Sequence, residues 1–111
     1  METLRQKQSR FVTMVVKLLD HGHSLGYSFS FGETYRSPEE AARRAKQGKG
    51  IANSLHTQRL AIDLNLFVDG KYMSSTDAHK VLGEYWESIG GTWGGRFKDG
   101  NHYSLEHKGI K

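Results

Sequence analysis

A carboxylate stands in the middle of an apolar stretch of the chain. The segment LAIDLNLFV, residues 60–68, places Asp63 between apolar residues that recur at every second position. An unpaired charge in a buried strand is costly, so Asp63 needs a partner, and a metal cation would supply one. His56 lies seven residues before Asp63, and His102 lies farther along the chain. Two imidazoles and one carboxylate form a ligand set that zinc accepts, with a fourth position left to water.

A second carboxylate, Asp99, lies three residues before His102 and fits a general base that activates water. Glu106 is a competing candidate, because in an extended strand it would share a face with His102. Spacing alone leaves two interpretations open. In one, these residues form a zinc hydrolase site. In the other, structural hydrogen bonds satisfy Asp63, and His102 is an ordinary strand residue.

The amino-acid composition excludes several kinds of metal site, nucleophile and membrane segment. The chain has 111 residues, which suits one domain, and no cysteine, which excludes disulfide scaffolds, thiolate zinc sites and cysteine nucleophiles. A metal must therefore be held by histidine or carboxylate side chains. There is no run of about 18 to 20 apolar residues for a membrane span, and residues 1–10 lack the apolar core of a signal peptide. We expect a protein made in a cytoplasm, without membrane insertion, and a monomer.

The formal net charge of +4 favours an anionic partner. We expect no nucleic-acid partner, because the aromatic residues alternate into a core and form no stacking platform. A basic run is interpreted as a solvated helix face and the loop after it, with attraction to an anionic cell wall as the alternative. The run consists of Arg43, Arg44, Lys46 and Lys49.

Hydrophobic periodicity predicts one α+β domain with a small, mostly antiparallel sheet and helices at both ends. Helices are expected over residues 3–20, 38–47 and about 76–89, and strands over 27–35, 60–68, 71–73 and 102–107. The inward residues of the first helix are expected to be Phe11, Val15, Leu18 and Leu19, with Val12 and Val16 alongside. Those of the third helix are expected to be Val81, Leu82, Tyr85, Trp86 and Ile89. Trp93 could line a cleft or fill the core.

The other histidines favour structural interpretations. His21 and His23 fall near the end of the first helix, where they would meet its dipole. His79 is expected to face solvent. His107 is expected on the face of the last strand opposite His102, which makes it a poor metal ligand.

The segment SLHTQRLAID resembles the SxHxxGxAxD signature of zinc D-Ala-D-Ala carboxypeptidases and phage L-alanyl-D-glutamate endopeptidases. Ser54, His56, Ala61 and Asp63 match the signature, and Arg59 replaces its glycine. These enzymes share the hedgehog/DD-peptidase fold, which the resemblance therefore implies.

Two further segments follow in the order that the family has. Trp93-Gly94-Gly95, then Asp99 and His102, is similar to the second signature, in which an acidic residue precedes a histidine by three positions. Aspartate at this position is typical of the endopeptidase branch, whereas the carboxypeptidases more often hold glutamate. Tyr35-Arg36-Ser37 is similar to a YRS segment whose arginine contacts the substrate.

The resemblance implies a zinc peptidase that acts on peptidoglycan stem peptides. Zinc would be held by His56, Asp63 and His102. Asp99 would be the base, and Arg36 and Ser54 would bind substrate. We expect an L-alanyl-D-glutamate endopeptidase, with a D-Ala-D-Ala carboxypeptidase or a non-catalytic zinc-binding virion module as alternatives.

The resemblance also implies a biological setting. The chain resembles a phage or prophage endolysin. We expect residues 1–111 to form a single catalytic domain, with no separate cell-wall-binding domain. Such an enzyme would wait in the host cytoplasm until a holin-type release brings it to bacterial peptidoglycan, its expected partner.

Overall fold

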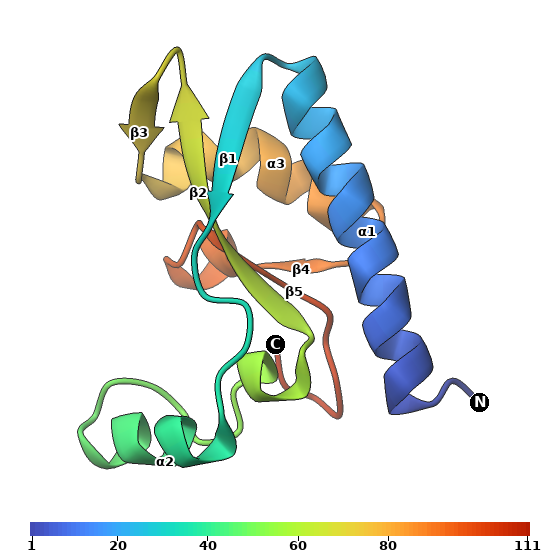
Figure 1. Cartoon of the computed structure of the whole chain (residues 1–111), viewed down its shortest axis with the longest axis vertical. Helices are drawn as coiled ribbons and strands as arrows, with labels where there is room; N and C mark the ends of the chain where they lie inside the picture. The colour runs from blue at the N-terminus through green and yellow to red at the C-terminus, as the bar shows by residue number, and fades with distance from the viewer.

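An antiparallel five-stranded sheet organises the chain, and the computed structural model describes all of residues 1–111 (Figure 1). The regular elements are α1 Leu4–Ser24, β1 Tyr27–Phe31, α2 Pro38–Lys46, β2 Ala61–Val68, β3 Lys71–Met73, α3 Thr76–Ser88, β4 Thr92–Trp93 and β5 His102–Ser104. Two short 3-10 helices, Leu55–Gln58 and Gly94–Phe97, precede β2 and β5. The strand order is β1-β2-β5-β4, with β3 paired to β2. The predicted α+β class is confirmed.

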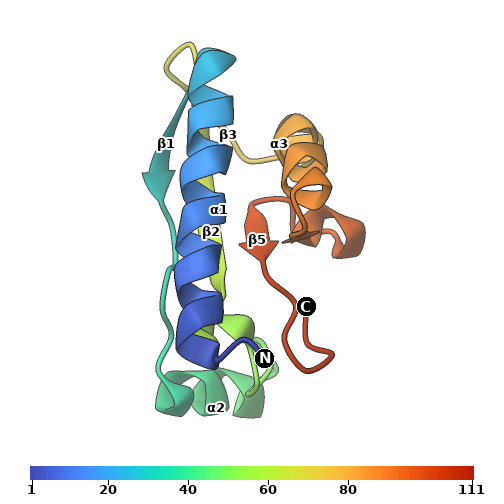
Figure 2. The ribbon, with the colours of Figure 1, turned by 90° about the vertical axis from the view of Figure 1, so that its right-hand side faces the viewer.

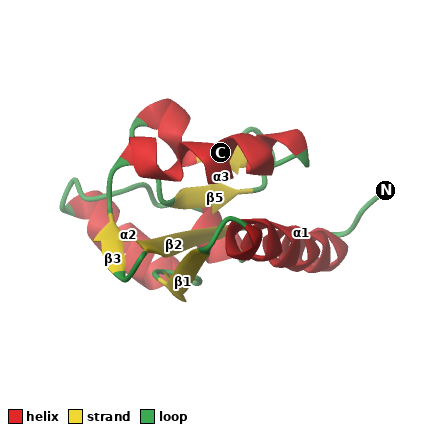
Figure 3. Ribbon diagram, turned by 90° about the horizontal axis from the view of Figure 1, so that it is seen from above, coloured by secondary structure: helices red, strands yellow, loops and turns green.

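Helices α1 and α3 pack against each other and share one hydrophobic core with β2. In two views at right angles, β5 lies between β2 and α3 (Figures 2 and 3). Helix α1 runs beside β1 and β2, and α2 lies at the end of the molecule opposite the turn between β2 and β3 (Figures 1 and 2). No helix is both long and apolar enough to cross a lipid bilayer.

Helix α1 begins with a capping box formed by Thr3 and Gln6 and continues four residues past the predicted end. Gly22 lies inside the added turn, and the ring of Phe29 packs on it. A Cβ at Gly22 would come within 2.4 Å of that ring. The buried stripe is narrower than predicted, because Val12 and Val16 are exposed.

Helix α3 starts at the cap Ser75, whose hydroxyl accepts a hydrogen bond from the Ala78 N–H. Its buried face includes Leu82 and Trp86, as predicted, but Val81 is exposed. Trp93 belongs to the core, and its indole N–H donates to the Gly100 carbonyl at 2.7 Å.

The expectation that His79 faces solvent is wrong. Its residue exposure is 1%, and Nδ1 forms a 2.7 Å hydrogen bond with the hydroxyl of Tyr103. Position 79 precedes Leu82 by three residues, so helical periodicity places both on the same buried face. Burial lowers the pKa of His79, and a backbone hydrogen bond to Met73 opposes part of that shift.

Two strands are shorter than predicted. After β1 ends at Phe31, the chain stays paired beside β2, because the Gly32 N–H donates to the Asp63 carbonyl at 2.8 Å. After β5 ends at Ser104, the Leu105 N–H donates to the Leu60 carbonyl at 2.9 Å. Both segments therefore remain tied to β2 although they leave the regular ladder.

Candidate metal centre and active site

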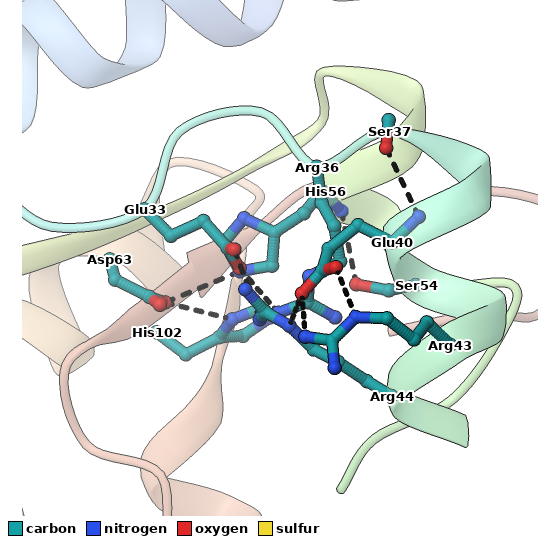
Figure 4. A network of polar contacts seen from close by, with 10 residues as sticks. All are labelled: Glu33, Arg36, Ser37, Glu40, Arg43, Arg44, Ser54, His56, Asp63 and His102. Atoms are coloured by element: carbon teal, nitrogen blue, oxygen red, sulfur yellow. Dashed lines mark hydrogen bonds and ion pairs between the residues drawn. The ribbon is translucent and has the colours of Figure 1, made fainter. Parts of the chain in front are cut away.

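Three side chains from separate segments converge at one point, and we call His56, Asp63 and His102 the metal-site cluster (Figure 4). Asp63 on β2 and His102 on β5 face each other as paired residues of the antiparallel ladder. His56 comes from the 3-10 helix before β2. The fold therefore brings together residues that are separated by up to 46 positions in the sequence.

The metal-site cluster fits a metal ion because its side chains offer suitable donor atoms and turn one donor atom each toward a common point. His56 Nε2 lies 3.4 Å from Asp63 Oδ1, and His102 Nδ1 lies 3.3 Å from the same oxygen. One candidate ligand atom from each residue lies within 4.8 Å of the others. The opposite ring nitrogens, His56 Nδ1 and His102 Nε2, are buried and have no hydrogen-bond partner. Two imidazole nitrogens and a carboxylate oxygen suit zinc.

The surroundings keep Asp63 ionised. Burial by itself raises the pKa of this carboxyl group, but hydrogen bonds and charge interactions with His102 and His56 more than offset it, and the pKa falls to about 2. A carboxylate in its charged form is the state that binds a metal cation.

The loop that carries His56 is shaped by its two ends. At the start, the Ser54 hydroxyl accepts a hydrogen bond from the His56 N–H at 3.2 Å and caps the 3-10 helix. At the end, Arg59 adopts a left-handed conformation with φ of 57°. Glycine adopts this conformation without steric cost, which explains why the family signature has glycine there. The guanidinium of Arg59 lies 4.0 Å from the centre of the Tyr35 ring.

Asp99 lies beside the cluster without joining it. Its Oδ2 is 4.0 Å from His102 Nδ1, and its side chain is 53% exposed. Burial of the remaining part raises the pKa of this carboxyl group. The preceding Trp-Gly-Gly segment makes this placement possible: a Cβ at Gly94 would lie 2.2 Å from the Asp99 carbonyl oxygen and 2.7 Å from His102 Cβ.

All six residues predicted for the site line one cleft of about 300 Å³. They are Arg36, Ser54, His56, Asp63, Asp99 and His102. Glu106, the competing base, does not line this cleft; it is exposed, and its carbonyl accepts a hydrogen bond from Lys7. The placement favours Asp99 over Glu106, while the role of each residue stays a prediction.

Arg36 is held close to the cluster by its backbone and its side chain. Its N–H donates to the His56 carbonyl at 3.2 Å, and its guanidinium donates to the carboxylate of Glu33. The Nε of Arg36 is buried and has no hydrogen-bond partner. The guanidinium is therefore held by Glu33 at a place where Arg36 lines the cleft.

Glu33 is a site residue that the sequence reasoning missed. Its carboxylate contacts Arg36, lies 3.1 Å from Arg44 Nη1, and lies 3.8 Å from His56 Nε2. Burial raises the pKa of Glu33, but Arg36, His56 and Arg44 outweigh that effect, and the pKa is lowered overall. The available signal was its place three residues before the arginine of the YRS segment.

Two other histidines and two arginines of the basic run have partners outside the cleft. His21 stacks on Tyr85 with ring centres 4.1 Å apart, and His107 pairs with Ile110 in an isolated bridge. In the basic run, Arg43 and Arg44 both form ion pairs with Glu40 (Figure 4). This pairing favours the solvated helix face over a free surface for an anionic wall.

The chain matches known proteins in sequence and in structure. The sequence profile of a family described as D-alanyl-D-alanine carboxypeptidase matches residues 47–105. The L-Ala D-Glu endopeptidase ChiX of Serratia marcescens has a similar structure, with a TM-score of 0.76, 22% identity, and coverage of 95% of this chain and 84% of ChiX. No curated protein matches the sequence.

A second solved structure is also similar. It is a variant of the vancomycin-resistance D,D-pentapeptidase VanY in complex with Zn(II), with a TM-score of 0.61 and 17% identity. The match covers 86% of this chain and 70% of VanY. At these identities the two structural matches establish the fold.

Proposed function

Because the chain belongs to the D-alanyl-D-alanine carboxypeptidase family of peptidoglycan metallopeptidases, we propose that it is a zinc-dependent L-alanyl-D-glutamate endopeptidase that cuts the peptidoglycan stem peptide. The observation that carries this proposal is the convergence of the metal-site cluster with Asp99 in one cleft. The likeness to ChiX supports the choice of bond. Cleavage of D-Ala-D-Ala is the second candidate, which the description of the family favours.

His56, Asp63 and His102 would hold the zinc ion. When bound, zinc supplies a water molecule of lowered pKa and an electrophile for a carbonyl oxygen. The ionised state of Asp63 and the convergence of one nitrogen from each imidazole on Asp63 Oδ1 support this assignment.

The other residues act on the substrate and on protons. Asp99 accepts a proton from the attacking water and delivers it to the nitrogen of the leaving amine. Arg36, which lines the cleft, donates from its guanidinium to the carbonyl oxygen as negative charge develops there. The hydroxyl of Ser54 caps the His56 loop and retains its proton for a hydrogen bond to the substrate backbone.

The bond that is cut can be read from the products. Purified sacculi are digested with the zinc-loaded protein, with and without chelator, and the fragments are identified by mass spectrometry. A new amino-terminal D-Glu is expected in the untreated digest and not in the chelated one. Release of D-Ala would identify a carboxypeptidase instead, and intact sacculi in both digests would support a non-catalytic module.

A role in bacterial lysis is the wider part of the proposal. An endolysin-like enzyme needs a route to the wall, and we propose holin-type release from the host cytoplasm, with residues 1–111 as the catalytic domain. Expression in a bacterial host with and without a co-expressed holin tests this role. Lysis that depends on the holin and on Asp99 is expected, and lysis without the holin would contradict it.

A further inference from the structure

The cleft has an uneven distribution of charge. Two carboxylates and three cationic residues line it, namely Asp63, Asp99, Arg36, Lys49 and Lys111. The charge of Arg36 is countered inside the protein, because its guanidinium contacts Glu33. The two positive charges of a zinc ion at the metal-site cluster would be offset by Asp63, its ligand, and by Asp99 beside it. The ammonium groups of Lys49 and Lys111 then remain as the cationic side chains of the cleft without an ion-pair partner.

Both lysines are available to a ligand. Each is exposed, and none of the ion pairs of the protein involves Lys49 or Lys111. The backbone at Lys49 is fixed, because its N–H donates to the Arg44 carbonyl at 2.8 Å just after α2. A neighbouring lysine, Lys46, is also exposed and unpaired but does not line the cleft.

We propose that Lys49 and Lys111 recognise a free carboxylate on the substrate residue that supplies the nitrogen of the scissile bond. This inference rests on the proposed function. In an Ala–Glu bond, the glutamate continues the chain through one carboxyl group and keeps the other free. In a terminal Ala–Ala bond, the leaving residue carries the terminal carboxylate. Either bond therefore places a carboxylate within a few atoms of the scissile nitrogen.

The arrangement gives specificity by charge. The cleft presents two ammonium groups without ion-pair partners next to the metal-site cluster, so an acidic residue on the leaving side is attracted. An amidated residue at the same place offers no charge to the ammonium groups. The chemical class that the cleft selects is thus a peptide with a carboxylate on the leaving side of the bond.

Two synthetic peptides test the proposal. Both contain L-Ala linked to D-Glu, and they differ in whether the free carboxyl group of D-Glu is a carboxylate or a carboxamide. The value of kcat/KM for each peptide is measured with the zinc-loaded parent, with Lys49→Gln, with Lys49→Gln/Lys111→Gln, and with Lys46→Gln as the matched control. Binding of both peptides is measured in parallel by calorimetry.

The parent is expected to prefer the carboxylate peptide about tenfold, the scale of a charge-assisted hydrogen bond. The double variant should lose this preference by losing activity on the carboxylate peptide alone, and Lys46→Gln should keep it. Equal cleavage of both peptides by the parent, or a preference that survives in the double variant, would overturn the proposal.

The calorimetry separates this inference from the proposed function. If neither peptide is cleaved but the parent binds the carboxylate peptide more tightly and the double variant does not, the proposed endopeptidase activity fails and carboxylate recognition stands. If neither peptide is cleaved and both bind equally, both proposals fail.

Discussion

Each face of β5 contacts a buried group that contains histidine, and the two groups have opposite properties. On one face, His102 meets His56 and Asp63. On the other face, the next residue, Tyr103, meets His79 at 2.7 Å. All three histidines are buried, so burial alone does not distinguish a functional histidine from a structural one.

The difference lies in what each ring meets. His79 has a neutral hydroxyl partner in a closed core, where burial lowers the pKa of His79 and raises that of Tyr103 well above its usual range. The rings of the metal-site cluster converge on a charged carboxylate and face an open cleft. A cluster that is neutral, paired and closed stabilises the fold, and one that is charged and open can bind a cation.

The largest effect is expected from removing a histidine of the metal-site cluster. His102→Ala or His56→Ala removes a nitrogen ligand, so each variant should lose the one zinc per chain that we expect in the parent. Wall hydrolysis should fall to the level of the chelated parent. His79→Gln removes the buried histidine of α3 that contacts Tyr103 on the other face of β5, and this variant should keep its zinc. Elemental analysis after dialysis measures this, and full zinc in both alanine variants would show that the ligands are misassigned.

The second-largest effect is expected when Asp99, the predicted general base, is changed. Asp99→Asn keeps the shape of the side chain and removes the proton acceptor, so hydrolysis should fall about 100- to 10,000-fold while zinc content stays at the parental level. Glu106→Gln, whose side chain lies outside the cleft, should cost little. Rates of wall hydrolysis at measured zinc occupancy test this pair. A near-normal Asp99→Asn beside an inactive, zinc-loaded Glu106→Gln would move the base to Glu106.

Arg36 is expected to act on the substrate and not on the metal. Arg36→Ala should keep zinc and lose about 100-fold or more in kcat/KM, in line with the loss of an oxyanion donor. Arg36→Lys should recover only part of the activity, because lysine keeps the positive charge but lacks the planar guanidinium. Glu33→Gln keeps Arg36 but removes its ionic partner and should lie between parent and Arg36→Ala. Normal turnover by Arg36→Ala would remove this role.

The sequence predicted which residues meet in this cleft because they lie in short signatures with fixed spacing. His56 and Asp63 are joined by one loop and one strand, and Asp99 and His102 by one turn, so local spacing carried most of the geometry. The glycine at position 94 is explained by its close packing against the Asp99–His102 turn.

What the sequence did not predict depends on contacts between distant segments. The position of Glu33 beside His56 arises because the chain after β1 stays paired with β2, which no local pattern specifies. Helical periodicity places His79 on the buried face of α3, but the hydroxyl that satisfies its ring there comes from Tyr103, 24 positions away. Polar residues are usually exposed, and only the partner makes this one an exception.

The neutral histidine cluster predicts a pH dependence of stability. Because burial lowers the pKa of His79, the unfolded chain binds more protons than the folded chain as the pH falls below the unperturbed value of about 6.5. Stability should therefore fall with pH in this range. In metal-free protein, His79→Gln should be less stable than the parent by about 1 to 3 kcal/mol at pH 7.5 and should lose less on acidification. Urea unfolding at pH 7.5 and 5 measures both. An equal loss in parent and variant would show that His79 does not contribute.

The smallest effect is expected at Arg59, which lies three residues after His56 and outside the lining of the cleft. Its left-handed backbone costs about 1 to 2 kcal/mol relative to glycine, while the contact of its guanidinium with Tyr35 returns about 0.5 to 1 kcal/mol. Arg59→Gly loses the contact, gains freedom in the unfolded chain and relieves the strain, so its free energy of unfolding should lie within about 1 kcal/mol of the parent. Arg59→Ala loses the contact and keeps the strain, so it should be the less stable of the two by about 1 kcal/mol. Both should keep zinc and turnover, because Arg59 does not line the cleft. Thermal unfolding and zinc analysis of the pair provide the measurement, and an alanine variant as stable as the glycine variant would show that the backbone at this position carries no strain.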